Sequence, residues 1–218
     1  IEILDAAGVR PDVVVGTSGG AVIGAGYAAN LPPQMITELV AAARWDHFGA
    51  LRPGRRLAVY DPAPMASTLR RRFGDLSIED LPRRFGALAY DIRSRRAVLL
   101  DHGSLVRALR ASTAVPLLFP PEYVDGHPMG DGSIVSGLPA WAARRLGATF
   151  VIGVGFGREE RPEAVWTRTR RYVLHAPERA DEVPDLLIEP AVQGFHRWRT
   201  VDVPAIIEEG RRAARAAV

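Results

Sequence analysis

Ser18 lies in a sequence context suited to nucleophilic chemistry. Residues 16–20 read Gly-Thr-Ser-Gly-Gly and directly follow the β-branched run 13–15. This pattern fits G-x-S-x-G, the sharp strand-to-helix turn that holds a nucleophilic serine at the top of an α/β sheet. Glycines two positions before and after the serine are expected to prevent a collision where the strand and the helix cross. The pattern therefore predicts that Ser18 is a nucleophile, with the helix dipole stabilising a developing oxyanion beside it.

Phosphate-binding loops also place glycines after a strand, and neither common type fits here. G-x-G-x-x-G fails because position 18 is serine and not glycine. A P-loop needs a lysine, and all 28 basic residues are arginine. A tight turn with a satisfied hydroxyl stays open as the structural alternative to a nucleophile.

The composition sets further bounds on the chemistry. The 218 residues, 47% hydrophobic and 24% charged, predict one globular domain, and no apolar run is long enough to span a membrane. The absence of cysteine excludes disulfides, a thiolate nucleophile and Cys-ligated metals, and the absence of lysine excludes a Schiff base. The net charge of +3 is weak support for a nucleic-acid partner, so none is expected. With no signal peptide visible, we expect a cytoplasmic protein.

Strands that alternate with helices predict a parallel sheet covered on both faces. The arginine-rich turn 93–96 predicts a hairpin between two apolar strands. Residues 156–184 are polar and weakly patterned. The expected strands are 12–15, 85–92, 97–100, 149–154 and 186–188, and the main helices are 1–7, 19–30, 33–45, 62–73, 104–111, 139–147 and 203–217.

A serine hydroxyl needs a base to take its proton. The order of a Ser-His-Asp triad in α/β-hydrolases would pair Asp131 or Asp185 with His196, but no glycine turn holds this histidine at a strand end. Asp131 is better placed, because the glycines on both sides of it let a carboxylate approach another backbone closely. A turn aspartate that binds its own backbone is the alternative. The other histidines are His47, His102, His127 and His175.

Four segments together resemble one family. They are the serine turn 16–20; Arg-Ala-Ser-Thr-Ala-Val-Pro at 110–116 with Phe-Pro-Pro at 119–121; Asp-Gly-Ser at 131–133 with Leu-Pro at 138–139; and Asp-Leu-Leu-Ile-Glu-Pro at 185–190. In this order they resemble the patatin-like phospholipases, especially the bacterial and neuropathy-target-esterase-like members. The resemblance covers nearly the whole chain.

The resemblance implies a three-layer α/β/α sandwich with a mostly parallel central sheet. It also implies a Ser-Asp dyad, Ser18 and Asp131, that hydrolyses acyl esters of phospholipids, lysophospholipids or simpler lipids without a metal or other cofactor. Asp131 would accept the Ser18 proton, and water would then cleave the acyl-enzyme. Since a free aspartate has a pKa of about 3.9, its surroundings must tune it. Because the substrate would be a lipid, peripheral attachment to a membrane stays open as an alternative to a purely cytoplasmic location.

Two departures from the family pattern leave other functions open. Ser133 stands where the family usually has glycine or alanine, and the glycine-rich loop that supplies oxyanion donors would precede Ile1. Residues 1–218 are therefore expected to form a single patatin-like catalytic domain without its N-terminal strand and this loop. The Gly19 N–H is then the identifiable oxyanion donor. A non-catalytic lipid-binding or regulatory module is the main alternative, and a Ser-His-Asp esterase is the other.

Overall fold

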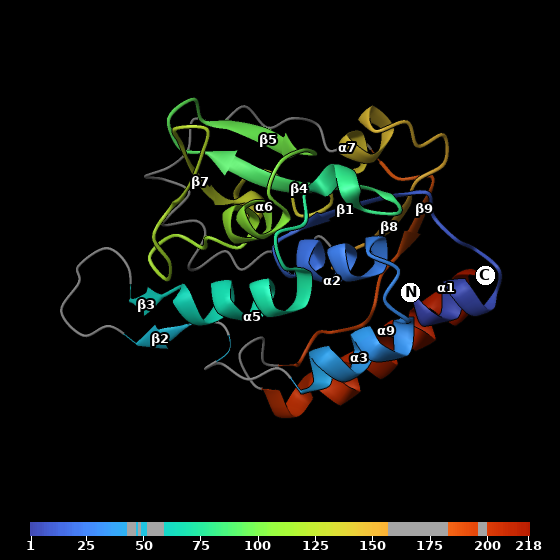
Figure 1. Ribbon diagram of the computed structural model, residues 1–218. Coiled ribbons are helices and arrows are strands. Elements are labelled where there is room, and N and C mark those ends of the chain that lie inside the picture. Colours follow the sequence, from blue (N-terminus) through green and yellow to red (C-terminus); the bar gives the residue numbers. More distant parts are fainter. Residues whose placement is uncertain (43–46, 48, 52–58, 157–182, 196–199) are drawn as a thin grey trace.

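The computed structural model describes residues 1–42, 47, 49–51, 59–156, 183–195 and 200–218 (Figure 1). Most of the weakly patterned stretch 156–184 therefore lies outside the described residues, as do His175 and His196.

The fold is built around strand β4 (Arg84–Asp91), which is buried on both faces after its first residue. Strand β1 (Val13–Thr17) pairs with β4 in parallel, whereas β5 (Arg96–Leu100) and β7 (His127–Asp131) pair with it antiparallel, and β6 (Glu122–Val124) extends the sheet beyond β7. Strands β8 (Ile152–Val154) and β9 (Leu186–Ile188) form a parallel pair, and β2 (Ala50–Leu51) and β3 (Tyr60–Asp61) an antiparallel one.

The predicted α/β class is confirmed, but the central sheet is mixed and not mostly parallel: β1 pairs with β4 in parallel, and the other described pairings of this sheet are antiparallel because two tight hairpins return the chain beside itself. One is the predicted turn between β4 and β5. The other joins β6 to β7 through Asp125 and Gly126, both in the left-handed region at φ 50° and 77°. Two successive positive φ angles are typical of the two-residue turns that match the twist of a hairpin.

Helices cover both faces of the sheet (Figure 1). On one face, Phe85, Ala87 and Ala89 of β4 pack in a core with side chains of α2, α5 and α6. On the other face, the Cβ position of Gly86 points at Leu146, which ends α7. This arrangement is the three-layer α/β/α sandwich. The helices are α1 (Glu2–Ala6), α2 (Gly19–Ala28), α3 (Pro33–Ala41), α5 (Ala63–Phe73), α6 (Leu105–Ser112), α7 (Ala140–Arg145) and α9 (Val203–Ala217), with short 3-10 turns η1 (Ile78–Asp80), η2 (Gly132–Ile134) and η4 (Thr200–Asp202).

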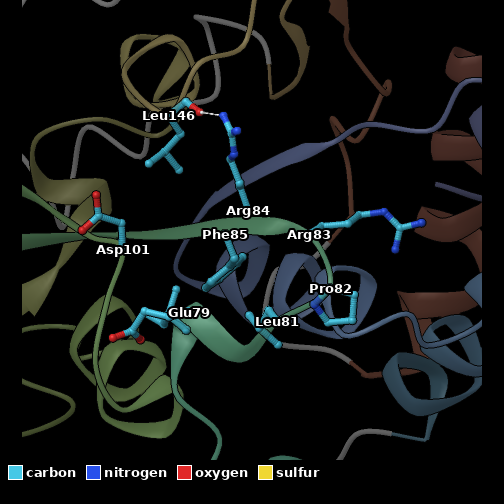
Figure 2. Close-up of a pocket in the computed structure, with 9 residues that line it drawn as sticks. Glu79, Leu81, Pro82, Arg83, Arg84, Phe85, Asp101 and Leu146 are labelled. Carbon is cyan, nitrogen blue, oxygen red and sulfur yellow. Dashed lines mark hydrogen bonds between the residues drawn. The ribbon is translucent and has the colours of Figure 1, made fainter.

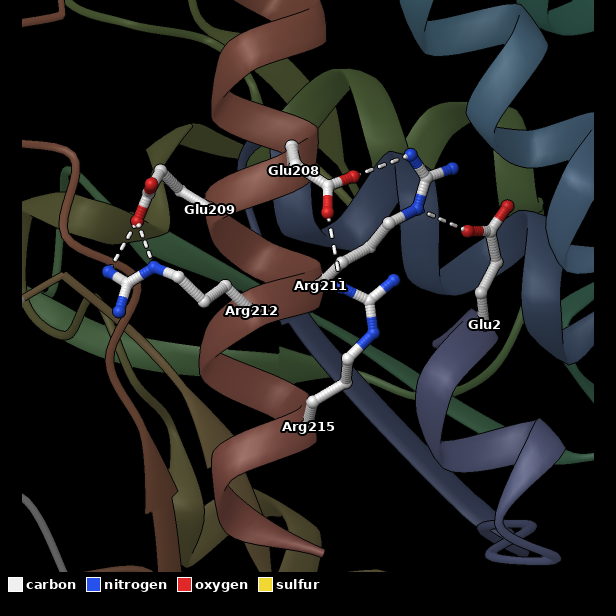
Figure 3. Close-up of polar contacts among 6 residues, drawn as sticks. All are labelled: Glu2, Glu208, Glu209, Arg211, Arg212 and Arg215. Carbon is white, nitrogen blue, oxygen red and sulfur yellow. Dashed lines mark hydrogen bonds and ion pairs between the residues drawn. The ribbon is translucent and has the colours of Figure 1, made fainter.

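A polar network joins the first and last helices (Figure 3). Arg211 of α9 donates to Glu2 of α1 at 2.8 Å, and the other oxygen of Glu2 accepts from Thr37 of α3 at 3.0 Å. The hydrogen bond from Arg211 is the main cause that lowers the pKa of Glu2. Because Leu4 and Ala214 also share a small apolar core, α1 and α9 are held together by both apolar and polar contacts.

Asp91 stabilises the turn between β4 and β5. Its carboxylate accepts from the Arg93 N–H at 2.8 Å, from the Ser94 hydroxyl at 2.7 Å and pairs with His127 at 3.1 Å. Burial raises the pKa of Asp91, but these hydrogen bonds together outweigh burial and leave the pKa below its ordinary value.

Asp91→Asn is expected to lower the free energy of unfolding by about 1.5–3 kcal/mol at pH 7, because hydrogen bonds to a charged group are lost. A lowered pKa means that this stabilisation is present above the unfolded pKa of about 3.9 and is lost as the pH falls through the folded one. Urea unfolding at pH 7 and pH 3 checks this, and an equal difference between variant and parent at both values would contradict it.

Candidate active site

Strands β1 and β7 end against adjacent residues of β4, and this brings Ser18 and Asp131 together. Thr17, the last residue of β1, pairs with Leu88, and Asp131, the last residue of β7, pairs with Ala89. Strand β5 occupies the opposite edge of β4 along both stretches, so β1 and β7 share one edge. The two strands run toward each other along this edge, and Ser18 follows directly where they meet.

Ser18 has the backbone conformation of a strained turn. It lies at φ 55° and ψ −125°, between the end of β1 and the first residue of α2. Positive φ is uncommon for a residue with a side chain and marks a site where the surrounding structure imposes the conformation. A Cβ atom on Gly16 would lie 2.4 Å from the backbone of Gly20, so only glycine fits at position 16.

The expected need for glycine at position 20 is wrong. A Cβ atom added there would meet nothing within 4 Å. The physical reason is direction: the Cβ of residue 16 would point into the first turn of α2, whereas the Cβ of residue 20 would point into open space. Sterics therefore require glycine at position 16 but not at position 20.

Asp131 is fully buried, with 0% of its surface exposed. Its Oδ1 accepts from the Ser133 N–H at 2.8 Å, as expected for a turn aspartate, and its own N–H donates to the Ala114 carbonyl at 2.9 Å. Its Oδ2 is buried and has no hydrogen-bond partner within 3.5 Å among the described residues. A buried carboxylate oxygen without a partner is rare enough to need an explanation.

Burial is the main cause that raises the pKa of Asp131. Hydrogen bonding from the Ser133 backbone and from the Ser18 side chain opposes the increase. The Ser18 hydroxyl is thus near enough to affect this carboxyl, although no hydrogen bond of ordinary distance and angle reaches Oδ2 from the described residues. Catalytic hydrogen bonds are often long before substrate binds.

Glycine at position 132 permits the close approach of Asp131 to β4. A Cβ atom there would lie 2.3 Å from the Leu88 carbonyl oxygen. The predicted role of the glycine neighbours is confirmed on this side of Asp131. On the other side, a Cβ atom added to Gly130 would lie 3.7 Å from its nearest neighbour, which is an ordinary van der Waals contact.

Gly19 and Gly20 occupy the first two positions of α2. N–H groups in the first turn of a helix have no acceptor inside the helix and lie at the positive end of its dipole. The Gly19 N–H therefore belongs to a helix terminus beside the Ser18 hydroxyl. An oxyanion that formed on a substrate here would meet a positive electrostatic potential.

Sequence reasoning missed Ser112, which contacts the serine turn directly. Its Oγ accepts from the Ser18 N–H at 2.9 Å and donates to the Leu88 carbonyl at 2.7 Å. Ser112 lies in the family-like segment 110–116, which gave it no role. The contact with Ser18 could not be predicted from the sequence nearby, because it depends on how α6 packs on β4.

The residues considered for a triad have other partners or lie outside the described residues. Asp185, just before β9, accepts from the N–H of Val151, just before β8, at 2.7 Å and from Arg144 of α7 at 3.1 Å. His102 pairs with Asp101 and His127 with Asp91. His196, the expected imidazole of a triad, is not among the described residues.

A shallow cavity of about 240 Å³ lies elsewhere, at the start of β4 (Figure 2). Arg84 pairs with Val13, so this cavity is at the opposite end of β1 from Ser18. The two arginines that line it have structural contacts. Arg84 donates to the Leu146 carbonyl, and Arg83 donates to the Tyr27 carbonyl and lies over the Tyr27 ring. The cavity is therefore not part of the Ser18 site.

The described residues contain neither a metal-binding cluster nor a membrane-spanning helix. No three histidine, aspartate or glutamate side chains among them gather closely enough to hold a metal ion. None of the described helices combines the length and the hydropathy that crossing a bilayer requires.

Comparisons with known proteins agree with the family resemblance. The family profile described as Patatin-like phospholipase matches residues 2–144. The chain is 30% identical over 167 residues to patatin-like phospholipase domain-containing protein 6 of Mus musculus, covering 73% of this chain and 12% of that protein. It is 30% identical over 157 residues to an uncharacterized NTE family protein of Mycobacterium bovis, covering 67% of this chain and 41% of that protein.

A third relative is neuropathy target esterase sws of Drosophila melanogaster, which is 28% identical over 169 residues, covering 73% of this chain and 12% of that protein. The matched segment thus spans less than half the length of each of these relatives. The matched profile nevertheless covers both the Ser18 and the Asp131 turns. The chain belongs to the patatin-like phospholipase family.

Proposed function

We propose that this protein is a serine acyl hydrolase that cleaves carboxylic esters of phospholipids, lysophospholipids or related lipids through a Ser18–Asp131 dyad. Family membership supports lipid hydrolysis in general. The dyad rests on one observation: β1 and β7 end at adjacent residues of β4, which brings the strained Ser18 near Asp131, whose Oδ2 has no hydrogen bond among the described residues. Residues 1–218 are proposed to act as one catalytic domain.

In this mechanism Asp131 Oδ2 accepts the Ser18 hydroxyl proton as Ser18 Oγ attacks the ester carbonyl carbon. The carbonyl π bond opens, and the negative charge moves to the carbonyl oxygen. When the tetrahedral intermediate collapses, the C–O bond to the alcohol breaks and Asp131 returns the proton to the leaving oxygen. Water then repeats the sequence on the acyl-enzyme and releases the fatty acid.

The surroundings of Asp131 suit it to this role. An aspartate with an ordinary pKa is a weak base at neutral pH, and burial raises the pKa of Asp131. The hydrogen bond from the Ser133 N–H occupies Oδ1, and Oδ2, which has no hydrogen bond among the described residues, is proposed to take the serine proton. The Gly19 N–H and the dipole of α2 are proposed to stabilise the charge on the carbonyl oxygen.

Lipid contact at the surface is part of the proposal, and exposed apolar side chains support it. Leu117 is 55% exposed and lies three residues after Ala114, whose carbonyl accepts from Asp131. The Leu117 carbonyl accepts from the Val59 N–H at 3.2 Å, and Val59 is also exposed. These leucine and valine side chains would suit peripheral contact with a lipid surface from the cytoplasm.

The pH dependence of the reaction follows from the state of Asp131. A general base must be ionised, so kcat/KM is expected to fall as the pH drops through the pKa of Asp131, which burial places above about 3.9. The measurement is kcat/KM for p-nitrophenyl butyrate from pH 4 to pH 9. A constant kcat/KM down to pH 4 would contradict the proposed base.

Covalent labelling with a fluorophosphonate probe tests the proposal, because the probe reacts only with an activated serine. The expected result is one adduct per chain, mapped to Ser18 by peptide mass spectrometry. Ser67, an exposed serine of α5, serves as the internal reference for unactivated hydroxyls. An unlabelled protein would favour the non-catalytic lipid-binding module instead.

A further inference from the structure

Ser112 connects the serine turn to the centre of the sheet. Its hydroxyl donates its single proton to the Leu88 carbonyl at 2.7 Å, which leaves a lone pair to accept from the Ser18 N–H at 2.9 Å. Leu88 is the register partner of Thr17 and the residue against which Gly132 packs. One hydroxyl therefore links α6 and the Ser18 turn to the β4 residue where β1 and β7 meet.

The helix that carries Ser112 is firmly held. Leu105 and Leu109 of α6 are fully buried in the core against β4, and Ser112 itself is 0% exposed. Arg110 of the same helix pairs with Glu122 of β6 at 2.7 Å. A hydroxyl on a rigid, buried helix end is suited to hold a neighbouring backbone group at one position.

Ser18 needs such a restraint because its conformation is unfavourable by itself. A residue with a side chain at φ 55° stays there only when surrounding contacts fix it. The Ser18 N–H is attached to the same Cα as the reacting side chain, and the Ser112 hydroxyl accepts its hydrogen bond. The Gly19 N–H, the next donor along the chain, is set by the same turn.

We propose that Ser112 is a positioning residue for the hydrolase reaction: its hydroxyl fixes the Ser18 turn so that Ser18 Oγ faces Asp131 and the Gly19 N–H faces the oxyanion. This inference rests on the proposed function of Ser18. Ser112 is too deeply buried to touch substrate, so its loss should lower kcat and leave KM nearly unchanged. A misplacement of about 1 Å in a catalytic group can lower the rate by about 100-fold.

The test compares Ser112→Thr with Ser112→Val, two variants of nearly equal shape that differ in the hydroxyl. Any strain from the added methyl group is common to both. We expect Ser112→Val to have a kcat for p-nitrophenyl butyrate about 10 to 100 times lower than that of Ser112→Thr, with KM within about twofold. Thr113→Val is the matched control, because the contacts of the Thr113 hydroxyl in the described part of the chain are with carbonyls of α6 and with Met65, and none is with the serine turn.

Equal kcat values for Ser112→Thr and Ser112→Val would overturn the inference, as would a difference confined to KM. Fluorophosphonate labelling of both variants separates this outcome from failure of the proposed function. Labelling at Ser18 with equal kcat values refutes the role of Ser112 alone. Absence of Ser18 labelling in the parent protein refutes the hydrolase proposal itself. Thermal unfolding of the two variants confirms that both are folded when kcat is compared.

Discussion

Ser18→Ala and Asp131→Asn are each expected to reduce kcat/KM for p-nitrophenyl butyrate to near background. For Asp131→Asn the expected decrease relative to the parent protein is about 10²–10⁴-fold. Ser18→Ala removes the atom that would form the acyl-enzyme. Asp131→Asn keeps the acceptor for the Ser133 N–H but replaces Oδ2 with a group that cannot take a proton. Each variant thus removes one half of the proposed dyad with little change of shape.

Two control variants separate this loss from general effects of substitution. Ser67→Ala and Asp75→Asn change the same residue types at exposed positions, and both should retain full activity. Activity of Ser18→Ala equal to that of Ser67→Ala would contradict the assignment of the nucleophile.

Asp131→Asn should also raise the melting temperature. Burial raises the pKa of Asp131, so its ionised form is unfavourable in the folded protein, and the neutral amide removes that cost at pH 7. A gain of about 1 kcal/mol would raise Tm by about 2–4 °C in a protein of this size. Loss of activity accompanied by loss of stability would instead indicate that Asp131 has a structural role.

Gly16→Ala is expected to be severely destabilising. The added Cβ would lie 2.4 Å from the carbonyl carbon and oxygen of Gly20, and both are backbone atoms that cannot move aside without displacing α2. We expect a loss of about 3 kcal/mol or more, which corresponds to a decrease in Tm of about 6–12 °C. Thermal unfolding followed by circular dichroism measures it.

Gly20→Ala provides the matched comparison within the same motif. Its Cβ would meet nothing within 4 Å, and alanine is favoured over glycine in a helix by about 1 kcal/mol. Its Tm should therefore equal or exceed that of the parent. If both variants lost the same stability, the steric account of the Ser18 turn would be wrong.

The Ser18 turn could be predicted from sequence because its determinants are local. A short β-branched run, a glycine that permits the crossing and a small-residue helix occur within sixteen residues of one another, and the structure has β1 and α2 at these positions. The same local pattern also led to the wrong expectation that position 20 requires glycine. A motif records which residues recur at a position but not the direction in which each Cβ points.

The approach of Asp131 to Ser18 could not be derived from local pattern. It depends on β4 pairing with β1 over its first half and with β7 over its second half, on the same edge. No strand was expected between residues 100 and 149, whereas the structure has a hairpin over 122–131 whose second strand ends at Asp131. The family resemblance supplied the pairing that periodicity could not.

The contacts of Ser112 were hidden for a related reason. Its hydroxyl bonds to the Ser18 N–H, 94 residues away, and to the Leu88 carbonyl, 24 residues away. Both are backbone groups, so the residue types at these positions do not indicate the contacts. Buried hydroxyl contacts of this kind become visible only when the packing of a helix on a sheet is known.

The rate at which a fluorophosphonate labels Ser18 in Asp131→Asn and in His196→Ala tests the central claim most directly. A carboxylate that activates the serine predicts labelling at least about 100-fold slower in Asp131→Asn and unchanged in His196→Ala. Slow labelling in His196→Ala with normal labelling in Asp131→Asn would show that an imidazole activates Ser18, and the Ser-Asp dyad would be refuted.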